Sequence, residues 1–227
     1  MTEAQWCACE NARELLRHVR TELKAPATPV GQRKLWLFGC AGCRLHWNEL
    51  TDKRSRAGIE FAERIADGQE EPAKFVKMYL DAEEAANRMF GGTSEQNAAL
   101  NVRSLLCRRT ADDAADAPGA MNTITTKAAG KHYQLWLDEL RILADLLRDI
   151  FGNPFRPVAF APEWRTDTAI ALARTMYETR EFSAMPILAD ALQDAGCDSD
   201  DILNHCRDAA QVHVRGCWVC DLVLGKE

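Results

Sequence analysis

The chain lacks several features that would place it in a membrane or on nucleic acid. No apolar run approaches the roughly 18 residues that a membrane-spanning helix needs, and residues 1–5 lack the basic and then apolar layout of a signal peptide. Acidic residues outnumber basic ones by 34 to 28, which gives a net charge of −6 and argues against a concentrated basic face for binding phosphates. We therefore expect a cytoplasmic protein with no membrane partner and no nucleic-acid partner.

The common catalytic signatures are also missing. The sequence contains no G-x-S-x-G, no P-loop, no dinucleotide-binding glycine motif and no H-E-x-x-H. The pair Glu83 and Glu84 lacks the second carboxylate group of a helical magnesium site, because Asn87 stands one turn later. Residues 198–201 begin like a calcium loop, but Leu203 occupies the position that needs glycine. We expect both acidic groups to be ordinary helix positions.

Helical patterning fills most of the sequence, and no segment alternates apolar and polar residues as a half-buried strand does. Two segments, 32–50 and 132–151, carry apolar residues at steps of 4, 3, 4 and 3. The first stripe consists of Trp36, Cys40, Cys43, Trp47 and Leu50, and the second of Trp136, Leu140, Leu143, Leu147 and Ile150. The pattern predicts an all-α protein of roughly eight to ten amphipathic helices, as an irregular bundle or as two packed lobes.

The weakest patterning lies at residues 110–130, which are rich in Ala, Asp, Thr and Gly and are interrupted by Pro118 and Gly119. This composition predicts a linker-like segment between an N-terminal helical lobe, residues 1–109, and a C-terminal helical lobe, residues 131–227. A single continuous domain is also compatible with the sequence.

Three stretches resemble an uncharacterised bacterial family of helical proteins with a C-terminal tail of the type HVRGCW…DLxLGKE. They are residues 145–158, 187–197 and 213–227. The resemblance extends to the opening residues and to the segment 40–47, and it implies a helical protein that occurs in many copies per genome. It supplies no activity. In this family the position of Cys217 is cysteine and that of Cys220 is usually aliphatic, so the resemblance implies that Cys220 is the weaker candidate ligand.

Nine cysteines are present, and four of them form two C-x-x-C pairs near opposite ends of the chain. These are Cys40, Cys43, Cys217 and Cys220. Four thiolates can complete a tetrahedral zinc site. Histidines that could replace one of the thiolates are His46, His205 and His213. The cysteine pattern therefore raises the hypothesis of a small zinc-stapled module, and zinc is the one cofactor that the sequence suggests.

Other interpretations of the cysteines remain open. Cys40 and Cys43 lie on a tryptophan-flanked helical stripe, which favours core thiols over ligands. Cys217 lies near the expected start of the last helix, where a redox-active thiol is commonly found, but the βαβ context of such enzymes is absent. A nucleophilic pair of Cys206 with His205 or His213 lacks an identifiable third, orienting group.

The absence of catalytic motifs favours a non-enzymatic helical protein-interaction or scaffold module, whose partner is another protein and whose pathway the sequence does not specify. The expected contact surface is Trp164, Arg165 and the proline-rich segment 151–160, unless Phe155 and Trp164 pack between the lobes. The zinc-stapled module is the alternative, followed by an enzyme of unrecognised type.

Overall fold

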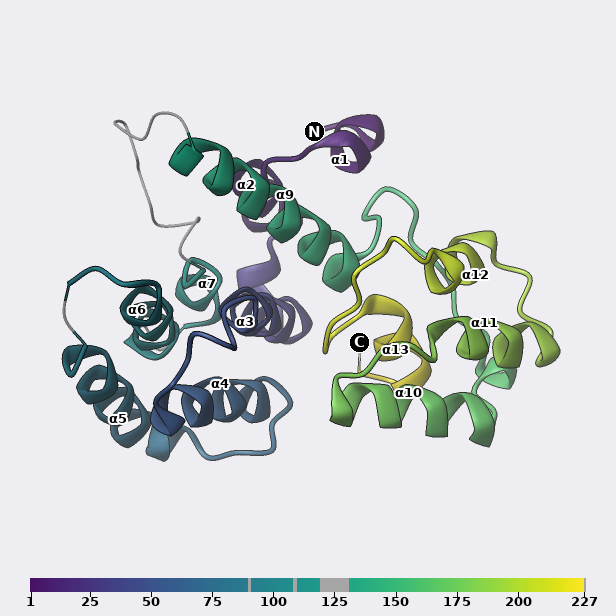
Figure 1. Ribbon diagram of the computed structural model, residues 1–227. Coiled ribbons are helices and arrows are strands. Elements are labelled where there is room, and N and C mark those ends of the chain that lie inside the picture. The colour runs from purple at the N-terminus through teal and green to yellow at the C-terminus, as the bar shows by residue number, and fades with distance from the viewer. Residues whose placement is uncertain (90, 108–109, 119–130, 227) are drawn as a thin grey trace. The chain divides into compact units, whose positions relative to one another are not determined.

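The computed structural model describes residues 1–227 except 90, 108–109, 119–130 and 227 (Figure 1). Over these residues 68% of the chain is helical, and no strand is formed. Twelve α-helices are described, ten of them with seven or more residues. The all-α prediction is confirmed. None of the described helices is both long and apolar enough to cross a bilayer.

The chain divides into two compact units. The larger unit is Glu10–Ala144, and the other, called the site unit below, combines Met1–Cys9 with Asp145–Glu227. The division falls within helix α9 (Lys131–Phe151) and differs from the predicted linker-like segment at 110–130. The described part of that segment, 110–118, buries four alanines and packs within the larger unit. The remainder lies outside the described residues.

The larger unit is arranged around α3. Its helices are α2 (Ala12–Thr21), α3 (Pro29–Arg44), α4 (Lys53–Ala66), α5 (Phe75–Asn87), α6 (Ser94–Cys107), α7 (Ala111–Ala114) and the first part of α9. Thr28 caps α3 by accepting a hydrogen bond from the backbone of Gly31. Helix α3 contacts α4, α6 and α7, so nine consecutive residues from Leu35 to Cys43 are buried. This central helix supplies much of the core of the unit.

Both cysteines of the first C-x-x-C pair belong to this core. Cys40 and Cys43 are buried on α3, and burial raises the pKa of the Cys43 thiol to about 12. The helix ends at Arg44, earlier than predicted, and Trp47 lies in the turn that follows. The guanidinium groups of Arg44 and Arg56 lie 4.2 and 5.3 Å from the centre of the Trp47 ring. The environment of the pair is that of buried core thiols.

The site unit packs four helices around one apolar core. They are α10 (Asp167–Thr179), α11 (Met185–Asp194), α12 (Asp200–Arg207) and α13 (Trp218–Leu224). Core residues from all four are Met176, Leu188, Leu192, Ile202 and Val219. The short helix α1 (Glu3–Ala8) is attached to the end of α9, because the indole of Trp6 donates to the carbonyl of Gly152 and Arg148 donates to the carbonyls of Trp6 and Cys9. The last turn of α9 is thereby fixed within this unit.

The expected contact surface is only partly exposed. Trp164 is 9% exposed and packs edge to face on Phe160, with ring centres 5.4 Å apart. Arg165 donates two hydrogen bonds to the carbonyl of Leu222. The prediction of an exposed contact is therefore wrong for Trp164, which is buried, while Arg165 is half-buried and hydrogen-bonded within the site unit. Phe155 is 38% exposed, as expected.

Candidate metal centre

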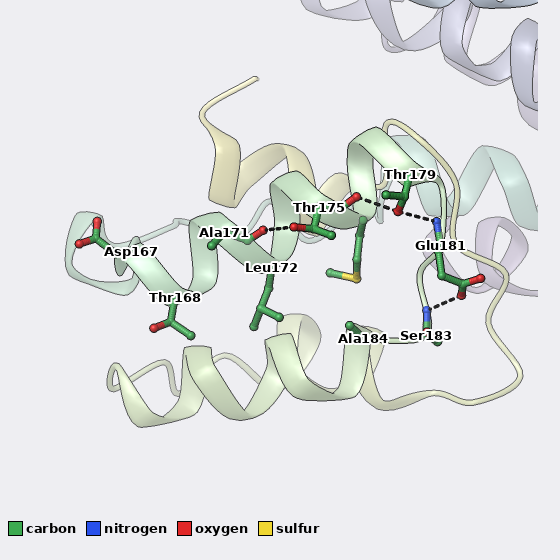
Figure 2. A pocket seen from close by; sticks show the side chains of 10 residues that line it. Asp167, Thr168, Ala171, Leu172, Thr175, Thr179, Glu181, Ser183 and Ala184 are labelled. Atoms are coloured by element: carbon green, nitrogen blue, oxygen red, sulfur yellow. Dashed lines mark hydrogen bonds between the residues drawn. The ribbon is translucent and has the colours of Figure 1, made fainter.

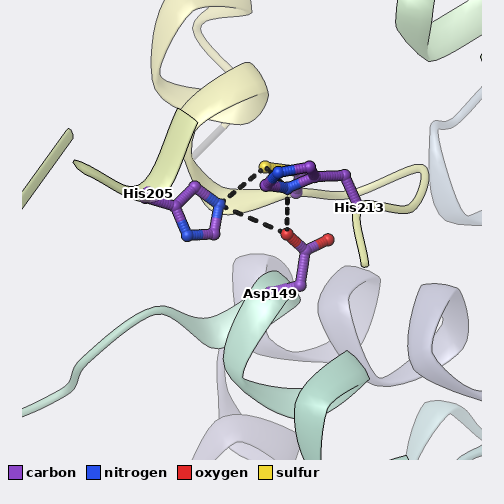
Figure 3. Close-up of side chains that lie close together, drawn as sticks. Asp149, His205 and His213 are labelled. Carbon is purple, nitrogen blue, oxygen red and sulfur yellow. Dashed lines mark hydrogen bonds and ion pairs between the residues drawn. The ribbon is translucent and has the colours of Figure 1, made fainter. Parts of the chain in front are cut away.

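Four potential metal ligands meet in the site unit (Figure 3). Asp149 comes from the last turn of α9, His205 from α12, His213 from the loop between α12 and α13, and Cys217 from the N-cap of α13. One ligand atom of each lies within 4.8 Å of those of the other three. Within the described ranges, no other group of three or more His, Cys, Asp or Glu residues meets the same criterion.

Local structure directs these side chains toward one another. In the loop, the backbone N–H of Cys217 donates to the carbonyl of Val214 at 2.8 Å, and Gly216 takes a positive φ of 98°. This conformation favours glycine, and the resulting turn places the side chains of His213 and Cys217 beside the same carboxylate. Asp149 lies on the buried side of α9, next to Ile150. Three separate parts of the chain thus contribute to the cluster.

Four distances within the cluster are close to those around a tetrahedral ion. Oδ1 of Asp149 lies 2.9 Å from Nδ1 of His213 and 3.2 Å from Nε2 of His205. Sγ of Cys217 lies 3.2 Å from Nε2 of His205 and 3.9 Å from Nδ1 of His213. Zinc with bonds of about 2.0 Å to nitrogen or oxygen and about 2.3 Å to sulfur separates its ligand atoms by about 3.3 to 3.6 Å. These four separations lie within a few tenths of an ångström of those values, whereas the outer limit for the whole cluster is 4.8 Å, so its most distant atoms would move closer by up to about 1 Å to bind the ion.

A backbone group orients the carboxylate. Asp149 is fully buried, and its Oδ2 accepts a hydrogen bond from the backbone N–H of Val214 at 2.9 Å. Oδ1 is the oxygen that faces the two imidazoles (Figure 3). Hydrogen bonds of this kind, made to a ligand from outside the coordination sphere, hold it in the geometry that the metal requires.

The charges of the cluster depend on one another. Burial disfavours the charged carboxylate, but hydrogen bonds and charges from His205 and His213 outweigh burial and lower the pKa of Asp149. Burial also opposes protonation of the histidines, yet their interactions with Cys217 and Asp149 raise the pKa of His205 to about 9 and that of His213 to about 10. Burial raises the pKa of the Cys217 thiol well above its usual value. Any protons that the histidines and the thiol hold in the metal-free protein would be displaced by a metal ion.

The same residues could form a catalytic cysteine, histidine and aspartate, but the geometry argues against this. A nucleophilic cysteine needs a thiolate that a substrate can reach. Cys217 is fully buried, and its pKa is raised. Both histidines also bind the same oxygen of Asp149, whereas a triad needs one base and one orienting group. Metal binding is the chemistry that uses all four groups.

The sequence identified three members of the cluster and missed the fourth. Cys217 was a predicted ligand, and His205 and His213 were predicted substitutes for a thiolate. Asp149 is marked in the sequence only by a carboxylate next to the apolar stripe of α9. Its position in the sequence carries no information about which distant residues Asp149 contacts.

The other predicted ligands lie outside the cluster. Sγ of Cys220 lies 3.8 Å from Sδ of Met185 in the core of the site unit. Cys40, Cys43 and His46 belong to the larger unit, where Nδ1 of His46 lies 2.8 Å from a carboxylate oxygen of Glu49. Because the two units are described separately, the site formed by four cysteines stays a prediction.

A groove borders α10 and the residues just before α11 (Figure 2). It has a volume of 740 Å³ and a mostly apolar lining that includes Ala171, Leu172 and Met176. The hydroxyls of Thr175 and Thr179 donate to helix carbonyls one turn earlier, so they are satisfied without a ligand. No pair of ionisable groups with catalytic geometry lines this groove.

Comparison of the chain with protein-family models, with curated proteins and with solved structures finds no match. The resemblance noted from the sequence stays a prediction.

Proposed function

We propose that the protein is a helical module whose site unit is stapled by a zinc ion bound to Asp149, His205, His213 and Cys217. The observation that carries this proposal is the convergence of two imidazoles, a carboxylate and a thiol from distant parts of the chain. Burying such groups costs free energy unless they are paired with one another or bind a metal. A zinc ion would neutralise the carboxylate and a thiolate while using a lone pair from each imidazole.

The donor set favours zinc over the other common ions. Calcium and magnesium prefer six or more oxygen ligands, whereas zinc accepts nitrogen, sulfur and carboxylate oxygen in a four-coordinate site. Four protein ligands with two fully buried members, Asp149 and Cys217, leave no open position for a substrate. Closed sites of this type are structural, so the proposed ion holds α9, α12 and α13 together.

Elemental analysis of the purified protein tests this proposal. We expect about one zinc ion per chain, and at least a hundredfold loss of affinity in the Cys217→Ser and Asp149→Asn variants, because each loses a charged ligand. Cys197→Ser is the matched control. Cys197 is also a buried cysteine of the site unit and lies outside the cluster.

The outcomes separate the two zinc hypotheses. Zinc lost in Cys43→Ser or Cys220→Ser, but retained in Asp149→Asn, would support the site formed by four cysteines and contradict the one proposed here. A wild-type chain that binds no zinc, even when titrated with the ion under reducing conditions, would contradict both.

We further propose that the module acts by binding another protein and not by catalysis. Two features support this role: the closed coordination of the proposed ion and the apolar groove along α10.

A photo-crosslinking residue placed at exposed Ala171 is expected to capture a protein in the native cell, and Leu172→Glu should abolish the adduct because it puts a charge into an apolar contact. The same crosslinker at exposed Glu163, outside the groove, serves as the control. Equal adducts at both positions, or none at Ala171, would argue against this surface.

A further inference from the structure

We propose that the zinc site is redox-sensitive: hydrogen peroxide converts Cys217 and Cys220 into a disulfide, and the zinc ion is released. The inference rests on the proposed function, because it requires Cys217 to be a zinc ligand. It assigns a role to Cys220, which the metal cluster leaves unused.

The positions of the two cysteines suit a short disulfide. Cys217 is the N-cap of α13, and Cys220 is the third residue of that helix. Side chains three residues apart at a helix lie on the same face. Both cysteines belong to the buried core of the site unit, and the neighbouring Cys220 thiol adds to the effect of burial in raising the pKa of Cys217. As the N-cap, Cys217 has non-helical backbone angles, with φ −47° and ψ 127°. A small rotation there can bring the Cβ atoms to the roughly 3.5 to 4.5 Å that a disulfide needs.

A small oxidant can approach the site from the side of the histidines. Both cysteines are fully buried, but the side chains of His205 and His213 are 12% and 6% exposed. Hydrogen peroxide is close to water in size, so it needs far less space to reach the thiolate than a larger disulfide does. Disulfide closure within the pair spans only four residues and competes well with pairing to the exposed Cys7.

The reaction balances with one peroxide. The Cys217 thiolate attacks one peroxide oxygen, so that an S–O bond forms and the O–O bond breaks. The departing hydroxide takes up a proton to become water. The Cys220 sulfur then attacks the sulfenic sulfur, the S–S bond forms, and the S–O bond breaks. The second hydroxide takes the Cys220 proton and leaves as water. The two sulfurs lose two electrons, and the peroxide gains them.

Oxidation removes the only sulfur ligand of the ion. A disulfide sulfur carries no charge, so Asp149, His205 and His213 remain as a three-ligand site. The thiolate is the form of cysteine that binds zinc. Zinc release therefore follows disulfide formation, and reduction restores the site.

The experiment treats zinc-loaded full-length protein with hydrogen peroxide and follows zinc with a chromogenic chelator. Peptide mapping identifies the disulfides. We expect about one zinc ion released per chain, a disulfide between residues 217 and 220, and recovery of zinc binding after addition of dithiothreitol and zinc. Cys220→Ser should bind zinc with the same stoichiometry and lose it to peroxide without recovery, because Cys217 then proceeds to the irreversible sulfinic acid. Cys206→Ser, another buried cysteine of the site unit, should behave as wild type.

Three results would overturn the inference. These are zinc retained while Cys7 is oxidised, zinc released without the disulfide between residues 217 and 220, and full recovery in Cys220→Ser. Each of them leaves the zinc proposal standing, because that proposal depends on zinc content before oxidation. A protein that binds no zinc would instead contradict the proposed zinc site itself.

Discussion

We expect that removing the proposed zinc ion, from a solution with free zinc at a thousandfold excess over its Kd, destabilises the site unit by about 4 kcal/mol and leaves the larger unit nearly unchanged. The ion binds the folded state, because its ligands lie on α9, α12, the following loop and α13 and come together only on folding. Native-state amide exchange measures this effect. Protection of the Leu203 and Asp221 amides, which donate to the carbonyls of Ser199 and Cys217, should fall on chelation. Protection of Phe38 and Ile59, in the core of the larger unit, should stay the same.

The stability of the metal-free protein should depend on pH in a direction set by the pKa shifts in the cluster. In metal-free protein the pKa values of His205 and His213 are raised to about 9 and about 10. Their stabilising contribution is thus fully present below about pH 6.5 and is lost as pH rises through about 9 to 10. The lowered pKa of Asp149 contributes stability that is present above about pH 4 and is lost as pH falls below it. Metal-free protein should therefore become less stable between pH 7 and pH 10.

Zinc reverses this trend, because binding displaces the protons of His205, His213 and Cys217. Zinc affinity, and hence the stability gained from zinc, should rise with pH between 6 and 8. Chemical denaturation at several pH values, with and without zinc, measures both slopes. In Asp149→Asn both slopes should flatten, since the carboxylate that holds the two protonated histidines is gone. Equal slopes with and without zinc in the wild-type protein would contradict the assignment of these ligands.

The sequence predicted the helical class and the burial of Cys40 and Cys43 well, because both depend on local periodicity. The stripe from Trp36 to Cys43 lies within one helix, so its spacing alone placed Cys40 and Cys43 in the core. The site was harder to predict. Cys217 was flagged as a candidate ligand and His205 and His213 as substitutes, but Asp149 lies 56 residues before His205. No local pattern specifies a contact over such a distance, because it depends on how α9 meets α12.

The predicted linker-like segment differs from the structure for another reason. Small residues carry little hydrophobic signal, so an alanine-rich segment looks like a connection even when its backbone is closely packed. Ala111, Ala114, Ala115 and Ala117 are all buried. Helix α7 packs against α3 at Gly39, where the absence of a side chain permits close approach. A segment with a weak hydrophobic pattern can therefore still be closely packed in the folded protein.

This close packing predicts that Gly39→Ala destabilises the larger unit by about 2 kcal/mol. A Cβ at residue 39 would lie 2.3 Å from the carbonyl oxygen and 2.9 Å from the carbonyl carbon of Ala114. These are backbone atoms, so α7 would have to move. Overpacking against backbone atoms that cannot rotate away should cost about 3 kcal/mol, the upper end of the usual range, and the roughly 1 kcal/mol that alanine adds in helix propensity offsets part of this cost. Denaturant unfolding of the variant measures the net change in the free energy of unfolding.

Gly58→Ala is the matched control, because Gly58 is also a buried glycine inside a helix of the larger unit. A Cβ at residue 58 would lie 2.9 Å from Cδ1 of Leu106 and 3.0 Å from Cγ1 of Val102. Both atoms are ends of side chains that can rotate away, so the gain in helix propensity should nearly cancel the crowding. The midpoint of Gly58→Ala should thus stay close to that of the wild type while that of Gly39→Ala falls. If both variants were equally stable, α7 would not pack on α3 through backbone contact, and residues 110–118 would be the connection that their composition suggests.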